Sequence, residues 1–105
     1  MIMVKIEIFI PCSHLEVLQE VLRSVGAGSY GFYDSAMSYS LVKGCWRPLE
    51  GANPYDGEIG VLKYADEYKV EVCVLNEDLT KTIDAIKKVH PYETPVINAI
   101  PLLEI

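Results

Sequence analysis

Two stretches of this chain share one succession of patterns, and that succession constrains the fold more than any other feature. Residues 3–10 and 68–74 alternate between apolar and mostly polar side chains, which is typical of strands with one buried face. Residues 15–25 and 79–89 follow them with apolar side chains at helical spacing, which indicates amphipathic helices. The sequence therefore predicts two strand–helix units.

The helix ends carry further signals. Ser13 and Glu16 have the spacing of a capping box before the first helix. Gly26 is expected to end that helix in the left-handed conformation, as glycine commonly does. Asn76 is expected to cap the second helix.

The rest of the chain reads as two strands and a long loop. Residues 28–40 are rich in aromatic and hydroxyl side chains, which favour a strand that 41–46 continue. Residues 47–60 hold two prolines and three glycines, so they form a loop with several turns. A short strand is expected over 59–64 and a last strand over 96–100.

The predicted order is therefore β-α-β-β-α-β, in one domain spanning 1–105. Right-handed crossovers convert this order into an α+β, ferredoxin-like split β-α-β fold. It has a four-stranded antiparallel sheet, ordered 4-1-3-2, with two helices on one face. Opposite charges suggest the register of the central pair, with Lys5 facing Glu71 and Glu7 facing Lys69.

The other sheet face would lie open, with a mixture of charged and aromatic side chains. Such a surface suits a partly wet interface, so we expect a homo-oligomer. The alternative is a monomer whose sheet faces water.

The net charge and the cysteines indicate which classes of binding partner and which cellular compartment to expect. The net charge of -6 favours neither nucleic acid phosphates nor an anionic membrane. No stretch of 18 apolar residues exists, so no spanning helix is expected. Three widely spaced cysteines and no secretion leader predict a cytoplasmic protein with reduced thiols.

The segment His90-Pro91-Tyr92-Glu93 is the first candidate site, because it follows a helix and precedes a strand. His90 and Glu93 supply one nitrogen and one oxygen, so we consider a divalent metal ion. His14 or a second subunit would have to complete such a site. The alternative is structural, with Pro91 ending the helix and Tyr92 packing.

The segment 44–60 is the second candidate site, because long loops in compact domains are usually functional or disordered. Arg47 could hold an anionic group through paired hydrogen bonds. Asn53 and Asp56 could orient a polar ligand. The alternative is that these groups only fix the loop to the sheet or to a neighbouring subunit.

Five strings resemble, in order, the inserted domain of the NGG-interacting-factor-three-like family, whose members are often described as homologues of a type-two GTP cyclohydrolase. They are Gly26-Ala27-Gly28, Tyr33-Asp34, the run from Trp46 to Pro54 (WRPLEGANP), Gly57-Glu58-Ile59-Gly60 and the run from His90 to Pro95 (HPYETP). The last also resembles a turn of the CutA divalent-ion tolerance proteins. The likeness implies a stand-alone version of that domain, with the PII/CutA-like trimeric fold.

The resemblance also sets a limit on activity. In the full-length family a dinuclear metal centre lies in a flanking domain that this sequence does not contain. The hydrolase activity is therefore not carried over, and no catalytic residue is assigned. The resemblance implies the following candidates for ligand binding: Tyr33, Arg47, Glu50, Asn53, His90, Tyr92 and Glu93.

The functional expectation is a non-catalytic, oligomeric regulatory module that senses a small molecule or a divalent metal ion. A trimer is favoured over a dimer, and the cofactor is unidentified. One alternative is a module that docks on a separate partner through the aromatic side chains Tyr30, Phe32 and Tyr55. Another is a metal-dependent enzyme that uses His90, Glu93 and His14.

Overall fold

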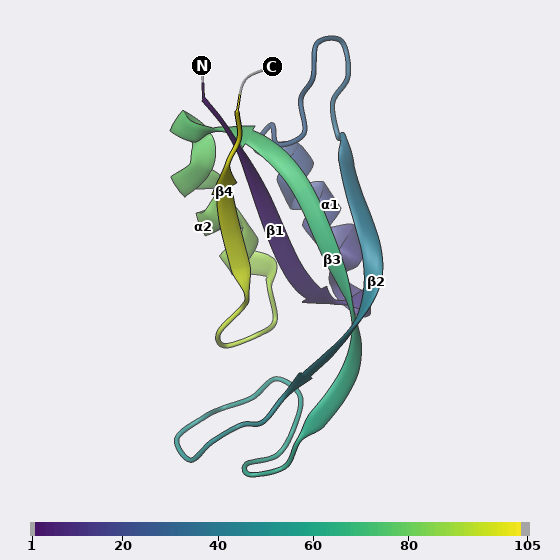
Figure 1. The fold of residues 1–105 in the computed structure, drawn as a ribbon, viewed down its shortest axis with the longest axis vertical. Helices are drawn as coiled ribbons and strands as arrows, with labels where there is room; N and C mark the ends of the chain where they lie inside the picture. Colours follow the sequence, from purple (N-terminus) through teal and green to yellow (C-terminus); the bar gives the residue numbers. More distant parts are fainter. Residues whose placement is uncertain (1, 104–105) are drawn as a thin grey trace.

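The computed structural model describes residues 2–103 of the chain. The elements follow the order β1 (Met3–Pro11), η1 (Cys12–His14), α1 (Leu15–Ser24), β2 (Met37–Trp46), β3 (Lys63–Leu75), η2 (Asn76–Asp78), α2 (Leu79–Val89) and β4 (Ile97–Pro101). The four strands form one antiparallel sheet in the order β2-β3-β1-β4. Both helices lie behind the same face of this sheet (Figure 1). The predicted fold and strand order are confirmed.

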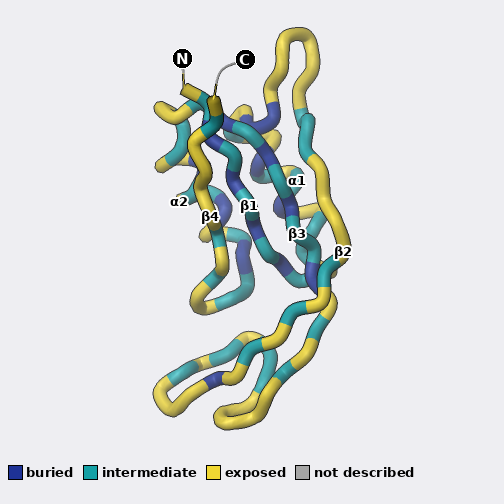
Figure 2. Tube along the Cα trace, viewed as in Figure 1, coloured by how far each residue is buried: buried dark blue, intermediate teal, exposed yellow. Residues whose placement is uncertain are grey.

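The core lies between the sheet and the two helices. Every second residue of β1 is buried, from Val4 to Ile10, and the buried valines of β3 continue the same face. Leu18, Leu22 and Ile86 meet them from the helices. Figure 2 shows this alternation along the two central strands. Each fully buried aliphatic side chain stabilises the fold by about 1.5–3 kcal/mol.

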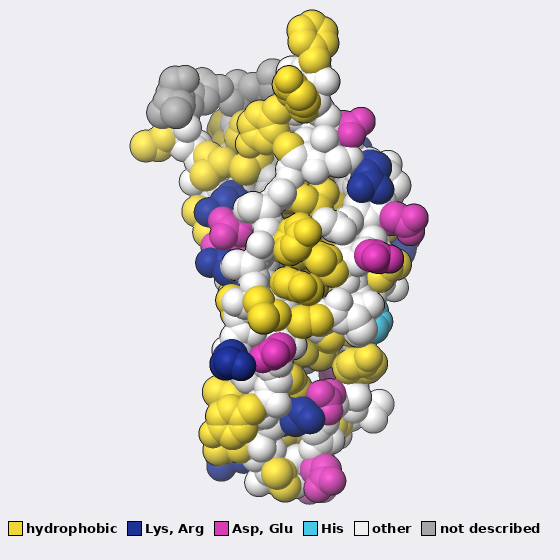
Figure 3. Space-filling view, turned by 90° about the vertical axis from the view of Figure 1, so that its right-hand side faces the viewer, with side chains coloured by type: hydrophobic (Ala, Val, Ile, Leu, Met, Phe, Trp, Pro, Cys, Tyr) yellow, Lys and Arg dark blue, Asp and Glu magenta, His cyan; other side chains and the backbone are white. Residues whose placement is uncertain are grey.

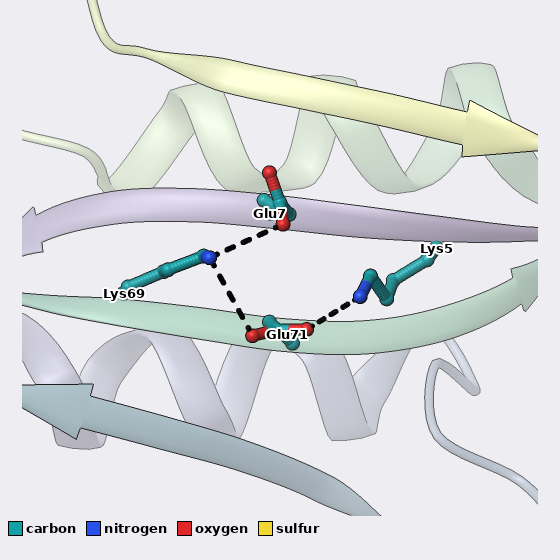
Figure 4. A network of polar contacts seen from close by, with 4 residues as sticks. All are labelled: Lys5, Glu7, Lys69 and Glu71. Atoms are coloured by element: carbon teal, nitrogen blue, oxygen red, sulfur yellow. Dashed lines mark ion pairs between the residues drawn. The ribbon is translucent and has the colours of Figure 1, made fainter.

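The register of the central strands differs from the prediction by two residues. Glu7 lies opposite Glu71, and Lys5 lies opposite Cys73. The predicted charge pairs still form, but diagonally: Lys5 Nζ lies 2.6 Å from Glu71, and Lys69 Nζ lies 3.4 Å from Glu7 (Figure 4). A shift of two residues keeps every side chain on its own face, so alternation alone could not detect the error.

These four charged residues form one network in the middle of the open sheet face. Lys69 also lies 3.8 Å from Glu71, so each carboxylate meets at least one ammonium group. The hydrogen bond and the charge of Glu71 raise the pKa of Lys5. The same contact lowers the pKa of Glu71. The open face therefore carries two lysines and two glutamates whose charges cancel.

The predicted helix caps are only partly correct. Ser13 and Asn76 lie in the short 3-10 turns before the helices, and neither helix has a side-chain cap at its first residue. The Ser13 hydroxyl instead lies 2.8 Å from His14 Nδ1. Gly26 does end α1 in the left-handed region, with φ 79°, and the Ala27 N–H donates to the Leu22 carbonyl.

The second strand begins later than the sequence suggested. Residues 28–36 form a projecting loop, closed by a bridge between Tyr30 and Tyr33, and β2 starts at Met37. β3 starts at Lys63 and runs for 13 residues. The short strand expected over 59–64 is therefore wrong except at its end, because residues 59–62 lie outside any strand.

Beyond the sheet, β2 and β3 continue together without the other strands. β1 pairs with β3 only from Glu67 onward, so β3 residues 63–66 pair with β2 alone. Residues 43–66, which we call the arm, extend past the four-stranded sheet and its two helices and curl beneath them (Figure 1). Neither helix within residues 2–103 has the length and apolar character that a membrane crossing requires.

Candidate functional site

His90 closes the end of α2 and holds the turn that follows. Its side chain is only 7% exposed. Nε2 lies 2.7 Å from the Phe9 carbonyl, and Nδ1 accepts the Tyr92 N–H at 3.2 Å. These partners require a neutral ring protonated at Nε2. Burial lowers the pKa of His90, although the bond to Phe9 opposes that effect.

The segment 90–96, which we call the turn, is held against the end of β1 by two hydrogen bonds, both to the backbone of Phe9. The Phe9 carbonyl meets His90, and the Phe9 N–H donates to the Val96 carbonyl at 3.2 Å. Both backbone groups of Phe9 are thus used to position the turn.

A hydrogen-bonded residue pair joins the arm to the turn. The Asn53 N–H donates to the Glu93 carboxylate, at 3.1 Å and 3.3 Å from its two oxygens. Within the arm, Trp46 Nε1 donates to the Asp56 carbonyl at 3.0 Å, and the Gly60 N–H donates to the Pro48 carbonyl at 2.7 Å. The long loop therefore has a defined shape.

A pocket of about 510 Å³ lies between the arm and the turn, at the end of the open sheet face. Three aromatic rings cluster at it, with centroids 5.5 Å apart for Trp46–Tyr92 and 6.0 Å apart for Tyr55–Tyr92. The lining residues are Phe9, Gly44, Cys45, Trp46, Arg47, Pro48, Leu49, Ala52, Pro54, Tyr55, Asp56, Glu67, Tyr92, Glu93, Thr94 and Val96.

Glu67 is the buried charged group of this pocket, with an exposed fraction of 7%. Its carboxylate occupies the space where a side chain at Gly44 would project, since a Cβ built there would contact Glu67 Oε1. Burial and hydrogen bonding to Glu67 raise the pKa of Tyr92 well above its ordinary value of 10.0. Tyr92 is therefore a protonated hydroxyl that faces a carboxylate.

The structure brings most of the sequence-predicted site residues to this region. Arg47, Tyr92 and Glu93 line the pocket, and Asn53 holds the arm against the turn. His90 lies beside Tyr92, with ring centroids 5.1 Å apart, but does not line the pocket.

Two of the predicted residues lie elsewhere. Glu50 is exposed in the arm and is not a lining residue. Tyr33 belongs to the loop 28–36, at the opposite end of the molecule from the arm (Figure 1). The pocket therefore gives no role to either residue.

The predicted metal pair gains no support from this geometry. Both ring nitrogens of His90 contact the backbone, and Glu93 contacts Asn53. Within residues 2–103, no three or more His, Cys, Asp or Glu side chains form a group suited to a metal ion.

Sequence reasoning missed Glu67 as well as the packing of Trp46 and Tyr55 against Tyr92. Alternation assigns Glu67 to the open face beside Lys69 and Glu71, and nothing in that pattern indicates burial. Trp46 is the first residue of the WRPLEGANP string, so the family resemblance was the one signal in the sequence that pointed to part of this cluster.

Comparison with curated proteins relates the chain to one protein family. The chain is 36% identical over 98 residues to the GTP cyclohydrolase 1 type 2 homolog of Halalkalibacterium halodurans. It is 31% identical over 98 residues to the protein of that name in Bacillus subtilis. Each match covers 93% of this chain and 26% of the relative, so the chain spans about a quarter of the length of these relatives. No family model matches the chain.

A solved structure identifies the same relationship. The crystal structure of a Bacillus cereus protein related to NIF3 superposes with a TM-score of 0.84 at 30% identity, over 96% of this chain and 26% of that one. The chain corresponds to one segment of the NIF3-related proteins. The resemblance that the WRPLEGANP and HPYETP strings indicated is thereby confirmed.

Smaller proteins share the fold over most of their own length. The CutA divalent cation tolerance protein of Archaeoglobus fulgidus gives a TM-score of 0.72 at 22% identity, covering 97% of this chain and 85% of that one. GlnK of Bacillus subtilis, solved as an ATP complex, gives 0.67 at 18% identity, covering 96% and 82%. The NIF3-related segment therefore has the PII/CutA-like fold.

Proposed function

We propose that this NIF3-related segment is a self-associating regulatory module that binds a small molecule in the pocket between the arm and the turn. The main support for the proposal is that three segments, hydrogen-bonded to one another, form the walls of the pocket. Its walls come from the end of β1, the arm and the turn, and each wall is fixed by hydrogen bonds to another.

The pocket has the dimensions and lining of a ligand site. Its volume of about 510 Å³ falls within the roughly 300–1,000 Å³ of small-molecule pockets. Aromatic and aliphatic side chains dominate its walls, and a few polar groups converge on it. Apolar walls supply affinity, while a small number of polar groups orient the ligand.

Binding is favoured over catalysis by the residues that line the pocket. Neither histidine is among them, so the commonest general base is missing from the wall. The activity that the relatives' name suggests is not transferred, because the chain spans only about a quarter of their length.

Self-association is proposed through the open sheet face. The charges of Lys5, Glu7, Lys69 and Glu71 cancel there, so a second copy could cover them without an unpaired charge. The pocket lies at the end of the same face, and a neighbouring copy would approach its mouth. The PII/CutA-like fold favours a trimer over a dimer.

The proposed compartment is the cytoplasm. Cys12, Cys45 and Cys73 are all free thiols, and persistent free thiols are typical of a reducing compartment.

Thermal melting with a panel of metabolites, nucleotides and divalent ions tests the binding proposal. A ligand at 100 times its dissociation constant adds about 2.7 kcal/mol of stability, which is readily seen as a rise in Tm. Trp46→Leu should abolish the rise. Tyr64→Leu is the matched control, because Tyr64 is an exposed aromatic residue of the arm that does not line the pocket. A panel without any effect on the unaltered protein would refute the proposal.

A second candidate function is docking on a partner protein through the loop 28–36. Phe32 is fully exposed and Tyr33 is 77% exposed, and large aromatic residues are common anchors of protein interfaces. Figure 3 shows hydrophobic side chains projecting at the end of the molecule where this loop lies. Titration against a NIF3-related protein that lacks the matching segment tests it. Phe32→Ser should weaken binding and Trp46→Leu should not.

A further inference from the structure

The charges of the pocket are unequal, and its buried carboxylate, that of Glu67, has no ion-pair partner within residues 2–103. The lining carries one guanidinium, from Arg47, and the carboxylates of Asp56, Glu67 and Glu93. Asp56 pairs with Lys63 at 3.3 Å, and Glu93 accepts the Asn53 N–H. Within residues 2–103, no lysine or arginine forms an ion pair with Glu67.

Burial makes this imbalance costly. Glu67 is 7% exposed, and an ionised carboxylate removed from water is unfavourable unless it is paired. Glu67 contributes to the raised pKa of Tyr92, but a neutral phenol supplies no opposite charge. A cation in the pocket would supply that charge.

The walls around Glu67 suit an organic cation. Trp46, Tyr55 and Tyr92 cluster at the pocket, and the faces of aromatic rings attract ammonium groups. Such rings also provide apolar surface for the carbon substituents of the cation. A carboxylate among several aromatic rings therefore combines two sources of attraction for one kind of ligand.

Other ligand classes fit these residues less well. A divalent metal ion requires several convergent oxygen or nitrogen ligands, and no such group of side chains occurs within residues 2–103. An anionic ligand would meet three carboxylates against one arginine. A neutral apolar ligand would leave the Glu67 carboxylate without an ionic partner.

We propose that the pocket binds an organic ammonium ion, with the charged nitrogen at Glu67 and the carbon substituents against Trp46, Tyr55 and Tyr92. This inference rests on the proposed function and names the chemical class of its ligand.

Isothermal titration calorimetry with choline and with its neutral carbon isostere, dimethylbutanol, tests the inference on the intact chain. The two molecules have nearly the same shape, and the charge of choline is independent of pH. Choline should bind at least about tenfold more tightly than dimethylbutanol, because Glu67 and the aromatic rings attract its positive charge. A tenfold difference in affinity corresponds to about 1.4 kcal/mol.

Two variants assign the charge preference to Glu67. Glu67→Gln keeps nearly the same volume and should reduce the ratio of the two affinities to near one. Glu50→Gln is the matched control, because Glu50 is an exposed arm residue outside the lining, and it should leave the ratio unchanged. Thermal melts establish that both variants are folded. A third variant, Trp46→Leu, should weaken choline binding while leaving Glu67 in place.

The outcomes separate this inference from the proposed function. Equal affinity for the two molecules, or a ratio that Glu67→Gln does not change, overturns the cation inference while a small-molecule pocket stands. Absence of binding by both molecules at millimolar concentration also overturns it. The proposed function fails only if the wider thermal panel is negative as well.

Discussion

The Glu93 carboxylate accepts the backbone N–H of Asn53, a residue 40 positions earlier in the chain. This contact joins the WRPLEGANP and HPYETP strings, which the sequence had singled out separately. The two candidate loops are therefore parts of one site, and Glu93 sets how closely the arm approaches the turn.

Replacing Glu93 with alanine should release the arm without unfolding the domain. Both partners are exposed, so the loss of stability should be about 1 kcal/mol or less. Amide hydrogen exchange at Asn53 should accelerate, because its N–H loses its acceptor. Glu50→Ala, a control in the same loop, should leave that rate unchanged. Equal exchange at Asn53 in both variants would argue that the contact does not persist in solution.

Stability should fall as the pH drops below about 6.5, in part because of His90. Burial holds the pKa of His90 below its ordinary value of 6.5, so the unfolded chain binds the proton more readily. The contribution is complete above pH 6.5 and is lost as the pH falls through the folded pKa. One proton limits the slope to about 1.4 kcal/mol per pH unit.

Urea denaturation between pH 7.5 and pH 5 measures this dependence. His90→Gln keeps a donor for the Phe9 carbonyl but does not titrate, so the dependence should flatten. His14→Gln is the control and should retain most of it. If both variants follow the unaltered protein, the dependence arises from other groups.

Adding a methyl group at Gly44 should destabilise the site through Glu67. The new Cβ would clash with Glu67 Oε1, the end of a flexible side chain that would have to move aside, so the cost should be about 1 kcal/mol, the low end of the range for overpacking. The same change made in a Glu67→Ala background should cost under about 0.5 kcal/mol, since the obstructing carboxylate is gone. A double-mutant cycle by urea denaturation gives both values. Equal costs in the two backgrounds would mean that Gly44 is required for another reason.

Reversing the charge at Lys5 should weaken self-association. Lys5→Glu would place a third carboxylate beside Glu7 and Glu71 on the open face, and like charges in an interface repel strongly. The dissociation constant should rise at least about tenfold in sedimentation equilibrium. Lys43→Glu is the control, because Lys43 is an exposed residue of the arm that pairs with Asp66. Unchanged association in Lys5→Glu would exclude the open face as the interface.

The fold could be predicted because its main signals are local. Alternation in residues 3–10 and 68–74, followed each time by a helical stripe, is sufficient for two strand–helix units. The register could not be predicted from charge, because lysine reaches diagonally across strands. Lys5 finds Glu71 although Cys73 lies directly opposite it.

The site could be predicted only in part, because its key burial arises from tertiary structure. Arg47, Tyr92 and Glu93 belong to recognisable strings and do line the pocket. Glu67 belongs to an alternating strand and becomes buried through Gly44 and Tyr92, which lie far from it in the sequence. No pattern within the strand records that proximity.

If the arm bends, its pivot should lie near Glu67, where β1 stops pairing with β3 and only β2 and β3 continue. A molecule bound between the arm and the turn would then lie close to this pivot. The far tip of the arm would then swing through a larger arc than the bound molecule itself. Occupancy of a small pocket would thus be converted into a displacement large enough for a neighbouring subunit to register.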